Sequence, residues 1–373
     1  MDSRILTGER IATVAGDAAA HDAAPDGVPR VAPTTASGVA RVLSEASARA
    51  WRVRVEHDSW SPADAPADLA LSTRGLATIG GISPVDQVAT VGAGLSLERL
   101  HAATLWCAVD PPGTGRTLGG VLATATSGPL RAAYGPIRDQ VLGLTAVTGD
   151  GRTITVGGRV LKNVAGYDLS KLFIGGFDAF GVIVSAHLRL RAAPRAQHTV
   201  LHTGLRSTLL RLGLAQLDAG AQPAALELIG RNATWTLAIR HHQDHAEPGG
   251  VAAPEAFWRE TAGWPAGAVT FRVGTVPDGL PRTLDILDDV LPPAAWISAS
   301  LYPGTVRWSG NATADQVACA RHVAAQHEMP ITLERAPWAL RAAAGVHGAY
   351  REGVGPLAIA LRHAFDPAGV FVV

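Results

Sequence analysis

The sequence predicts an α+β protein built from two domains. Its 373 residues exceed what one typical hydrophobic core organises. The 41 glycines and 24 prolines suit a chain rich in loops and short strands better than a helical bundle. After Pro194 the pattern changes, because helix-like and short strand-like runs alternate from about 195 to 345. That alternation favours an antiparallel sheet with helices on one face.

The first domain is expected to open with a strand–helix–strand unit. Residues 1–27 form a polar lead, and 28–33 (VPRVAP) follow as a strand. Thr35 can cap a helix over 36–50, whose apolar residues share one face. Residues 52–56 alternate as the next strand.

Further elements of this domain follow from periodicity and turn residues. We expect strands over 67–79 and 87–94, and a helix over 97–109 that Ser96 can cap. The Asp-Gly pair at 150–151 predicts a β-hairpin. Residues 180–191 alternate like a buried strand before Pro194.

Composition excludes several classes of protein. The formal net charge is zero, so the chain has no basic field for nucleic acid. Every long apolar run is interrupted by Arg, Asp or Gly, so no membrane span is predicted. The N-terminal residues lack a continuous apolar stretch, which favours a cytoplasmic location, with any membrane association supplied by partners. Two cysteines, Cys107 and Cys319, are too few for a disulfide framework, a zinc site or an iron–sulfur cluster.

Two blocks of sequence resemble a known family. Residues 157–176 (GGRVLKNVAGYDLSKLFIGG), with the strand-like run after them, are similar to the KNxxGYDLxKLxIGSxGTLGVI signature of FAD-binding oxidoreductases of the vanillyl-alcohol oxidase, or PCMH, type. Residues 109–147 resemble that family's DPPGxGxTxGGxLATNxSGPxRxxYGxxRDxVLG block. With weaker similarity around them, the resemblance covers most of 28–193. Within the family, the chain looks most like the E subunits of bacterial glycolate oxidases.

The resemblance implies a domain plan. A PCMH-type FAD-binding domain with two subdomains would occupy 1–193, and an α+β cap domain with an antiparallel sheet would occupy 194–345. Residues 346–373 would return to the flavin domain.

The resemblance also implies where the cofactor would lie. Small residues let backbone N–H groups reach a diphosphate and a flavin ring without an intervening side chain. The implied cofactor-lining positions are Pro112, Gly113, Thr117, Leu118, Gly119, Gly120, Thr124, Ser127, Gly128, Gly181, Val182 and Ile183. The alternative is a glycine-rich turn that holds no ligand.

Three cofactor segments depart from the family pattern. The family has a GGGT-like loop around the diphosphate, whereas residues 55–62 (VEHDSWSP) contain no glycine and two acids. Asp178 replaces a glycine, Ala179 replaces a hydroxyl residue and Thr126 replaces an asparagine. A carboxylate beside a diphosphate is repulsive, so these changes predict weaker FAD binding.

Other polar groups carry weaker signals. No catalytic residue is assigned. Lys162, Asn163, Tyr167, Asp168 and Lys171 are the polar set of the 157–176 block, and Tyr167 is either a neighbour of the redox site or a packed tyrosine. The pair Arg138-Asp139 is expected to fix a loop. No metal site is expected, because the histidines of HHQDH (His241, His242 and His245) follow a strand and the chain lacks the HxGDGNxH-type motif of the catalytic relatives.

Three functions stay open. In the first, the chain is an FAD-binding subunit of a glycolate oxidase or dehydrogenase complex, with a catalytic flavin subunit and an iron–sulfur subunit as partners. In the second, it is a structural subunit of that complex, which kept the fold and lost tight FAD binding. In the third, it is an independent oxidase, for which His57 lies in the loop that carries a covalent flavin in some relatives.

Overall fold

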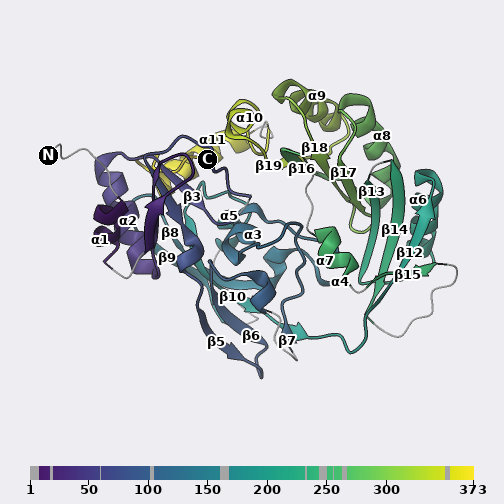
Figure 1. Cartoon of the computed structure of the whole chain (residues 1–373), viewed down its shortest axis with the longest axis horizontal. Coiled ribbons are helices and arrows are strands. Elements are labelled where there is room, and N and C mark those ends of the chain that lie inside the picture. Colours follow the sequence, from purple (N-terminus) through teal and green to yellow (C-terminus); the bar gives the residue numbers. More distant parts are fainter. Residues whose placement is uncertain are drawn as a thin grey trace.

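A computed structural model describes residues 8–16, 20–58, 60–100, 105–159, 168–231, 233–242, 250–254, 256–262, 267–348 and 353–373 (Figure 1). Helices and strands are mixed along the chain, and an eight-stranded sheet lies on one side of the molecule while a four-stranded and a five-stranded sheet lie on the other (Figure 1). The predicted α+β class is confirmed. Of the 157–176 block, residues 160–167 lie outside the described residues, including Lys162, Asn163 and Tyr167.

The first small sheet is partly parallel and has the order β1-β2-β4-β3. Its strands are β1 (Ala20–Ala23), β2 (Pro29–Ala32), β3 (Val53–Glu56) and β4 (Leu69–Ser72). Helices α1 (Gly8–Ala15) and α2 (Ala36–Arg49) pack on it, and the Thr35 hydroxyl caps α2 by accepting from the Gly38 N–H. The strands predicted over 28–33 and 52–56 and the helix predicted over 36–50 are confirmed as β2, β3 and α2, within one residue at each end.

The predicted strand over 67–79 is wrong in its second half. After β4 the chain forms a 3-10 turn, η1 (Thr73–Gly75), before β5 (Ile79–Ser83) joins a different sheet. A Cβ on Gly75 would lie 2.7 Å from the Ala32 carbonyl oxygen, so the turn is pressed against β2 and the strand cannot continue.

The second small sheet is antiparallel, with the order β5-β6-β10-β8-β9. It adds β6 (Val88–Gly92), β8 (Val141–Val147), β9 (Thr153–Gly157) and β10 (Val182–Arg189). The hairpin expected at 150–151 joins β8 to β9, and Gly151 adopts a φ of 83° there. Short elements on or beside this sheet are η2 (Leu97–Leu100), β7 (Leu105–Trp106), α3 (Leu118–Thr124), α4 (Arg131–Tyr134), η3 (Ile137–Gln140), α5 (Ser170–Phe173) and β11 (Arg191–Ala192).

The helix expected over 97–109 is also wrong. Only the 3-10 turn η2 forms, residues 101–104 lie outside the described residues, and 105–106 pair with β11 as a short strand. The apolar residues that suggested a helical face, among them Cys107, are buried by pairing and packing instead.

The large sheet has eight antiparallel strands in the order β15-β12-β14-β13-β17-β18-β16-β19. The strands are β12 (His198–Gly204), β13 (Ala225–Arg231), β14 (Thr234–His241), β15 (Val251–Ala252), β16 (Val269–Gly274), β17 (Trp296–Ser300), β18 (Thr305–Gly310) and β19 (Ile331–Arg335). Its helices are α6 (Arg206–Asp218), α7 (Phe257–Ala262), α8 (Leu280–Val290), α9 (Ala314–Ala325) and α10 (Trp338–Ala344), with the 3-10 turn η4 (Pro277–Gly279).

The two faces of the large sheet differ in chemistry. Helices α6, α8 and α9 share one apolar core with the sheet and lie on its outer side (Figure 1). Polar side chains of alternate residues point the other way, toward the first half of the chain. Arg272 donates to the Ala125 carbonyl oxygen at 3.0 Å, and Arg307 donates to that of Ser127 at 2.6 Å.

The C-terminal residues lie against the first small sheet. After α11 (Val354–Phe365), the backbone N–H of Val53 donates to the Val370 carbonyl oxygen at 2.7 Å, and Phe371 bridges Val53 in parallel. The C-terminus accordingly lies close to β3 (Figure 1). None of the helices in the described ranges has the length and apolar character needed to span a bilayer.

Candidate functional site

Three segments that are distant in sequence meet at the end of β3. They are residues 57–62 without Ser59, the start of α3 at Thr117, and the turn at Phe177 and Asp178. Thr117 caps α3, because its hydroxyl accepts from the Gly120 N–H at 3.2 Å. Phe177 and Asp178 adopt φ values of 50° and 65°, a conformation in which glycine is the usual residue. We call the space between these segments the dinucleotide cleft.

The Asp58 carboxylate lies at the centre of the dinucleotide cleft. Its Oδ2 accepts from Arg116 Nε at 2.8 Å and from the Thr117 N–H at 3.2 Å, and its Oδ1 accepts from the Trp60 N–H at 2.9 Å. The side chains of Asp58 and Arg116 are 1% and 2% exposed. Burial raises the pKa of Asp58, but the Arg116 guanidinium outweighs burial, so the pKa lies below its ordinary value. Asp58 is thus a buried anion with its donors already in place.

His57 and Asp178 form a second pair beside the first. The His57 Nε2 lies 3.0 Å from both carboxylate oxygens of Asp178, and Nδ1 lies 2.9 Å from the Thr73 hydroxyl. Burial lowers the pKa of His57, but Asp178 and then Asp58 outweigh burial and Arg116, so the net pKa is raised. Both ring nitrogens of His57 therefore have partners within the chain.

Trp60 closes the side of the cleft near Gly113. The Arg116 guanidinium carbon lies 4.2 Å from the centre of the Trp60 ring, a cation–π distance. A Cβ on Gly113 would lie 2.7 Å from Trp60 Nε1, so glycine leaves the room that the indole occupies. The cavity that remains in the cleft has a volume of about 30 Å³. One water needs about 10–15 Å³, so the space admits roughly two waters.

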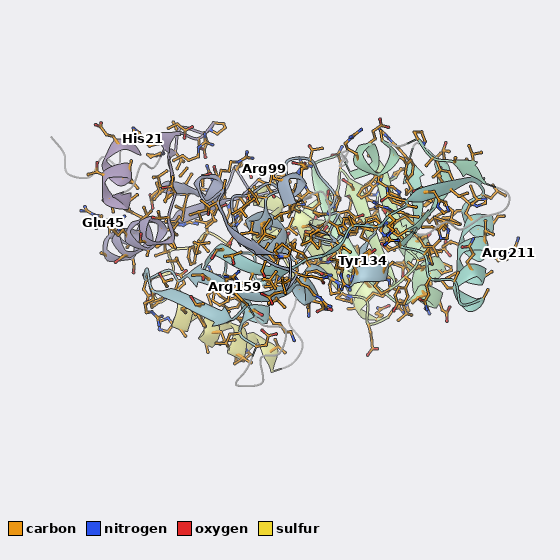
Figure 2. The ribbon with its side chains drawn as sticks, turned by 90° about the horizontal axis from the view of Figure 1, so that it is seen from below. His21, Glu45, Arg99, Tyr134, Arg159 and Arg211 are labelled. Carbon is orange, nitrogen blue, oxygen red and sulfur yellow. The ribbon has the colours of Figure 1, made fainter. Side chains whose placement is uncertain are left out.

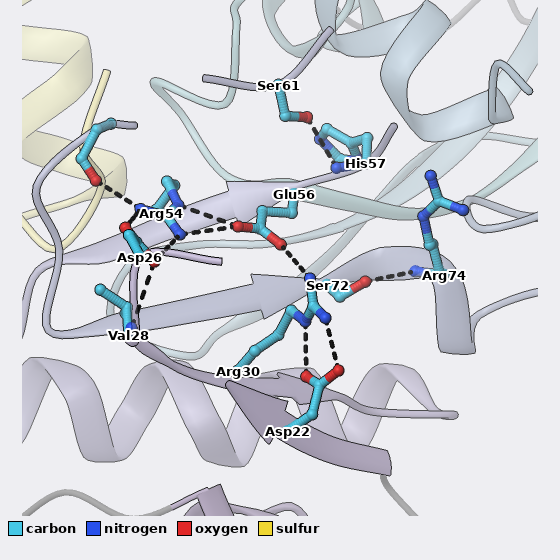
Figure 3. A network of polar contacts seen from close by, with 11 residues as sticks. Asp22, Asp26, Val28, Arg30, Arg54, Glu56, His57, Ser61, Ser72 and Arg74 are labelled. Carbon is cyan, nitrogen blue, oxygen red and sulfur yellow. Dashed lines mark hydrogen bonds and ion pairs between the residues drawn. The ribbon is translucent and has the colours of Figure 1, made fainter. Parts of the chain in front are cut away.

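A polar network holds the base of this loop. Arg54, fully buried on β3, binds Asp26, Glu56 and the Ala65 carbonyl oxygen, and Glu56 also meets Arg30 (Figure 3). Past the end of the strand, the His57 N–H donates to the Ser61 hydroxyl at 2.9 Å (Figure 3). The direction in which His57 and Asp58 leave β3 is therefore fixed by contacts on both sides.

The structure brings some of the sequence-derived positions to the cleft. Gly120 and Thr124 line it, and Thr117 faces Asp58. A Cβ on Gly120 would overlap the Asp58 carboxylate, and one on Gly119 would lie 2.8 Å from His57 Nδ1. The small residues thus face side chains of the chain itself. Pro112 accepts from Arg116 through its carbonyl oxygen.

The remaining positions lie elsewhere. The Leu118 N–H donates to Leu95 within the core, and Val182 and Ile183 are buried strand residues of β10. A Cβ on Gly181 would lie 2.7 Å from the Val147 carbonyl oxygen, so this glycine serves the pairing of β8 with β10. Ser127 and Gly128 face the large sheet and Asp110.

Sequence reasoning missed several residues at the cleft. They include Trp60, Thr73, Arg116 and Arg341, and the guanidinium carbon of Arg341 on α10 lies 5.3 Å from the centre of the Phe177 ring. One signal was available for Arg116, since a buried acid at 58 requires a buried cation. Nothing in the local pattern indicated the other three.

A second polar region lies between the two halves of the chain. The Tyr134 hydroxyl bonds His242 Nδ1 at 2.7 Å, and Tyr134 lies between the halves in Figure 2. Burial raises the pKa of Asp110 to about 6, against the lowering effect of Arg240 on β14. A cavity of about 850 Å³ opens nearby, between residues 125–139 and strands β16, β18 and β19.

The candidate metal ligands take part in ring contacts. His241 stacks on His198, with ring centres 5.0 Å apart, and His242 packs against Trp106. Within the described ranges, no three His, Cys, Asp or Glu side chains gather in a metal-ligating group, and His245 lies outside those ranges.

Comparisons with known proteins find a family match for part of the chain. Residues 29–157 match the family described as FAD binding domain. Over 121 residues the chain is 39% identical to glycolate oxidase subunit GlcE of Escherichia coli, covering 30% of this chain and 34% of that protein. Over 135 residues it is 36% identical to a mitochondrial D-lactate dehydrogenase (cytochrome) of Arabidopsis thaliana, covering 35% of this chain and 23% of that protein. The chain thus spans about a third of GlcE and less of the plant enzyme.

Solved structures share the fold over most of the chain. A Phl p 4 variant, a glucose dehydrogenase, superposes with a TM-score of 0.66 at 15% identity, covering 93% of this chain and 90% of that one. An alkyldihydroxyacetonephosphate synthase gives 0.64 at 15% identity, covering 92% and 76%. Residues 29–157 of the chain thus match the FAD binding domain family, and these solved structures share the fold over most of the chain. Its relatives include FAD-binding oxidoreductases of the glycolate oxidase and D-lactate dehydrogenase type.

The family match and the flavoprotein relatives support FAD as the cofactor of this domain. The donors in the cleft, Arg116 and the Thr117 N–H, suit an anion, but they already bind the Asp58 carboxylate. The roughly 30 Å³ left between His57, Asp58 and Asp178 does not hold a diphosphate. As arranged here, the residues that replace the family's glycine loop do not fit the diphosphate of FAD.

Proposed function

We propose that this chain is a subunit of a complex of the glycolate oxidase type, which oxidises 2-hydroxy acids and passes electrons onward. The observation that carries the proposal is the 39% identity to glycolate oxidase subunit GlcE. In this proposal, 1–193 is the FAD-binding domain, 194–345 is the cap domain and 346–373 is a segment that returns to the first domain.

The proposal divides the work between subunits. A catalytic flavin subunit would take the hydride from the substrate, and an iron–sulfur subunit would carry electrons away. This chain would supply a PCMH-type domain, in which Thr117, Gly119, Gly120 and Thr124 are the sequence-derived positions that lie at the cleft. When bound, FAD supplies two-electron redox chemistry.

A second role within the same complex is favoured by one observation. The Asp58 carboxylate occupies two anion donors of the cleft, Arg116 Nε and the Thr117 N–H. A subunit arranged in this way would serve as a structural part that docks the flavin subunit. The third hypothesis, an independent oxidase with flavin linked to His57, has less support because both ring nitrogens of His57 are engaged.

Reconstitution tests membership of the complex. The chain would be co-expressed with the catalytic flavin subunit and the iron–sulfur subunit from its own source, and the product would be analysed by size-exclusion chromatography and by glycolate- and D-lactate-dependent dye reduction. We expect one assembly that contains all three subunits and loses activity when this chain is omitted. A chain that elutes alone, or an assembly fully active without it, would contradict the proposal.

A further inference from the structure

We propose that His57, Asp58 and Asp178 form an internal plug that occupies the diphosphate part of the dinucleotide cleft, so that this chain binds FAD weakly or not at all. The inference rests on the chain's FAD-binding domain but not on its membership of a complex. It concerns the chain alone, and it is tested on the chain alone.

The first argument is that an anion is already present where the diphosphate would bind. Arg116 Nε and the Thr117 N–H converge on one oxygen of Asp58 at 2.8 and 3.2 Å. A Cβ on Gly120 would overlap that carboxylate, so the carboxylate lies directly on the small-residue surface of α3. A diphosphate could use these donors only after Asp58 leaves them.

The second argument is that two departures from the family pattern contact each other. His57 stands in the loop that is glycine-rich in relatives, and Asp178 stands 121 residues later in place of a glycine. Their side chains meet at 3.0 Å. The carboxylate at 178 is 14% exposed, and His57, when protonated, supplies a cation at hydrogen-bond distance from it. The two replacements therefore act as a matched pair.

The third argument is that the plug is held rigidly and leaves little space. Arg54 and Glu56 fix the end of β3, Ser61 binds the His57 N–H, and Trp60 stacks on Arg116. The remaining cavity of about 30 Å³ is too small for a dinucleotide.

Flavin binding by the isolated chain tests the plug. The purified wild-type chain would be denatured and assayed for released flavin, then titrated with FAD while flavin fluorescence is followed. The triple variant H57G/D58G/D178G restores the small residues. The matched control D86G makes the same Asp-to-Gly change on the exposed turn between β5 and β6.

We expect wild type and D86G to carry no flavin, and the triple variant to bind FAD at least a hundredfold more tightly. If the triple variant does not fold, as judged by circular dichroism, D58N/D178N takes its place. It keeps the shapes and removes the charges, and we expect at least tenfold tighter binding than for wild type. Wild type with stoichiometric FAD, or a folded variant that binds FAD no more tightly than wild type, would overturn the proposal. Neither result depends on whether the chain assembles with other subunits.

Discussion

Replacing Asp58 with alanine should strongly destabilise the first half of the chain. The substitution removes the only carboxylate that pairs with Arg116 within the described residues, and Arg116 is only 2% exposed. Breaking a buried ion pair from one side costs about 3–5 kcal/mol, because the remaining charge stays buried without a partner. For a domain of this size, about 1 kcal/mol lowers Tm by roughly 2–4 °C. We therefore expect D58A to lower the Tm of this half by about 6–20 °C.

Differential scanning calorimetry measures this effect. The double variant D58A/R116M removes both charges, so it should recover more than half of the loss. The control D86A changes an exposed acid and should stay within about 0.5 kcal/mol of wild type. A D58A variant as stable as D86A would refute the view that Asp58 and Arg116 stabilise each other.

Three further predictions concern His57, Gly120 and Glu227, a buried residue of β13 in the large sheet. The pKa of His57 is raised in the folded chain, so its pairing with Asp178 stabilises the fold fully at pH values below the unfolded pKa of about 6.5. This stabilisation is lost as pH rises through the pKa of the folded chain. Tm should therefore fall from pH 6 to pH 9, and the H57Q variant should show a smaller fall. Burial raises the pKa of Glu227 to about 7 from 4.5, against the hydroxyls of Ser298 and Ser300, so the folded chain holds a proton that the unfolded chain releases. Stability of the large sheet should therefore decrease by about 3 kcal/mol as pH rises from 4.5 to 7, and urea titrations of E227Q should show no such decrease. The G120A substitution should lower the free energy of unfolding by about 1–3 kcal/mol, because the added Cβ would overlap the Asp58 carboxylate. The same substitution in a D58G background should cost much less. Equal losses in both backgrounds would contradict the contact between residue 120 and Asp58.

The general fold was predictable because its signals are local or come from long family blocks. The helix after Thr35 follows from a cap and one apolar face, and the hairpin at 150–151 follows from Asp-Gly. The helix predicted over 97–109 is wrong because the apolar residues near Cys107 are buried by strand pairing. The local sequence of these residues does not reveal which other strand they pair with. The strand over 67–79 failed because Gly75 turns the chain against β2.

The candidate site was predictable only as a set of anomalies. The sequence shows acids and a histidine where relatives have glycine, but the pairing of His57 with Asp178 spans 121 residues. The partner of Asp58 is 58 residues away, at Arg116. Contacts at such separations depend on how the sheets and α3 pack together, so local periodicity carries no information about them. The anomalies therefore predicted weakened binding but not its physical form.

The visible absorption spectrum of the purified wild-type chain, recorded after incubation with excess FAD and removal of the unbound cofactor, tests the account most directly. We predict a colourless protein, since Asp58 holds the donors that the cofactor would need. A yellow protein that retains one FAD per chain would contradict the account.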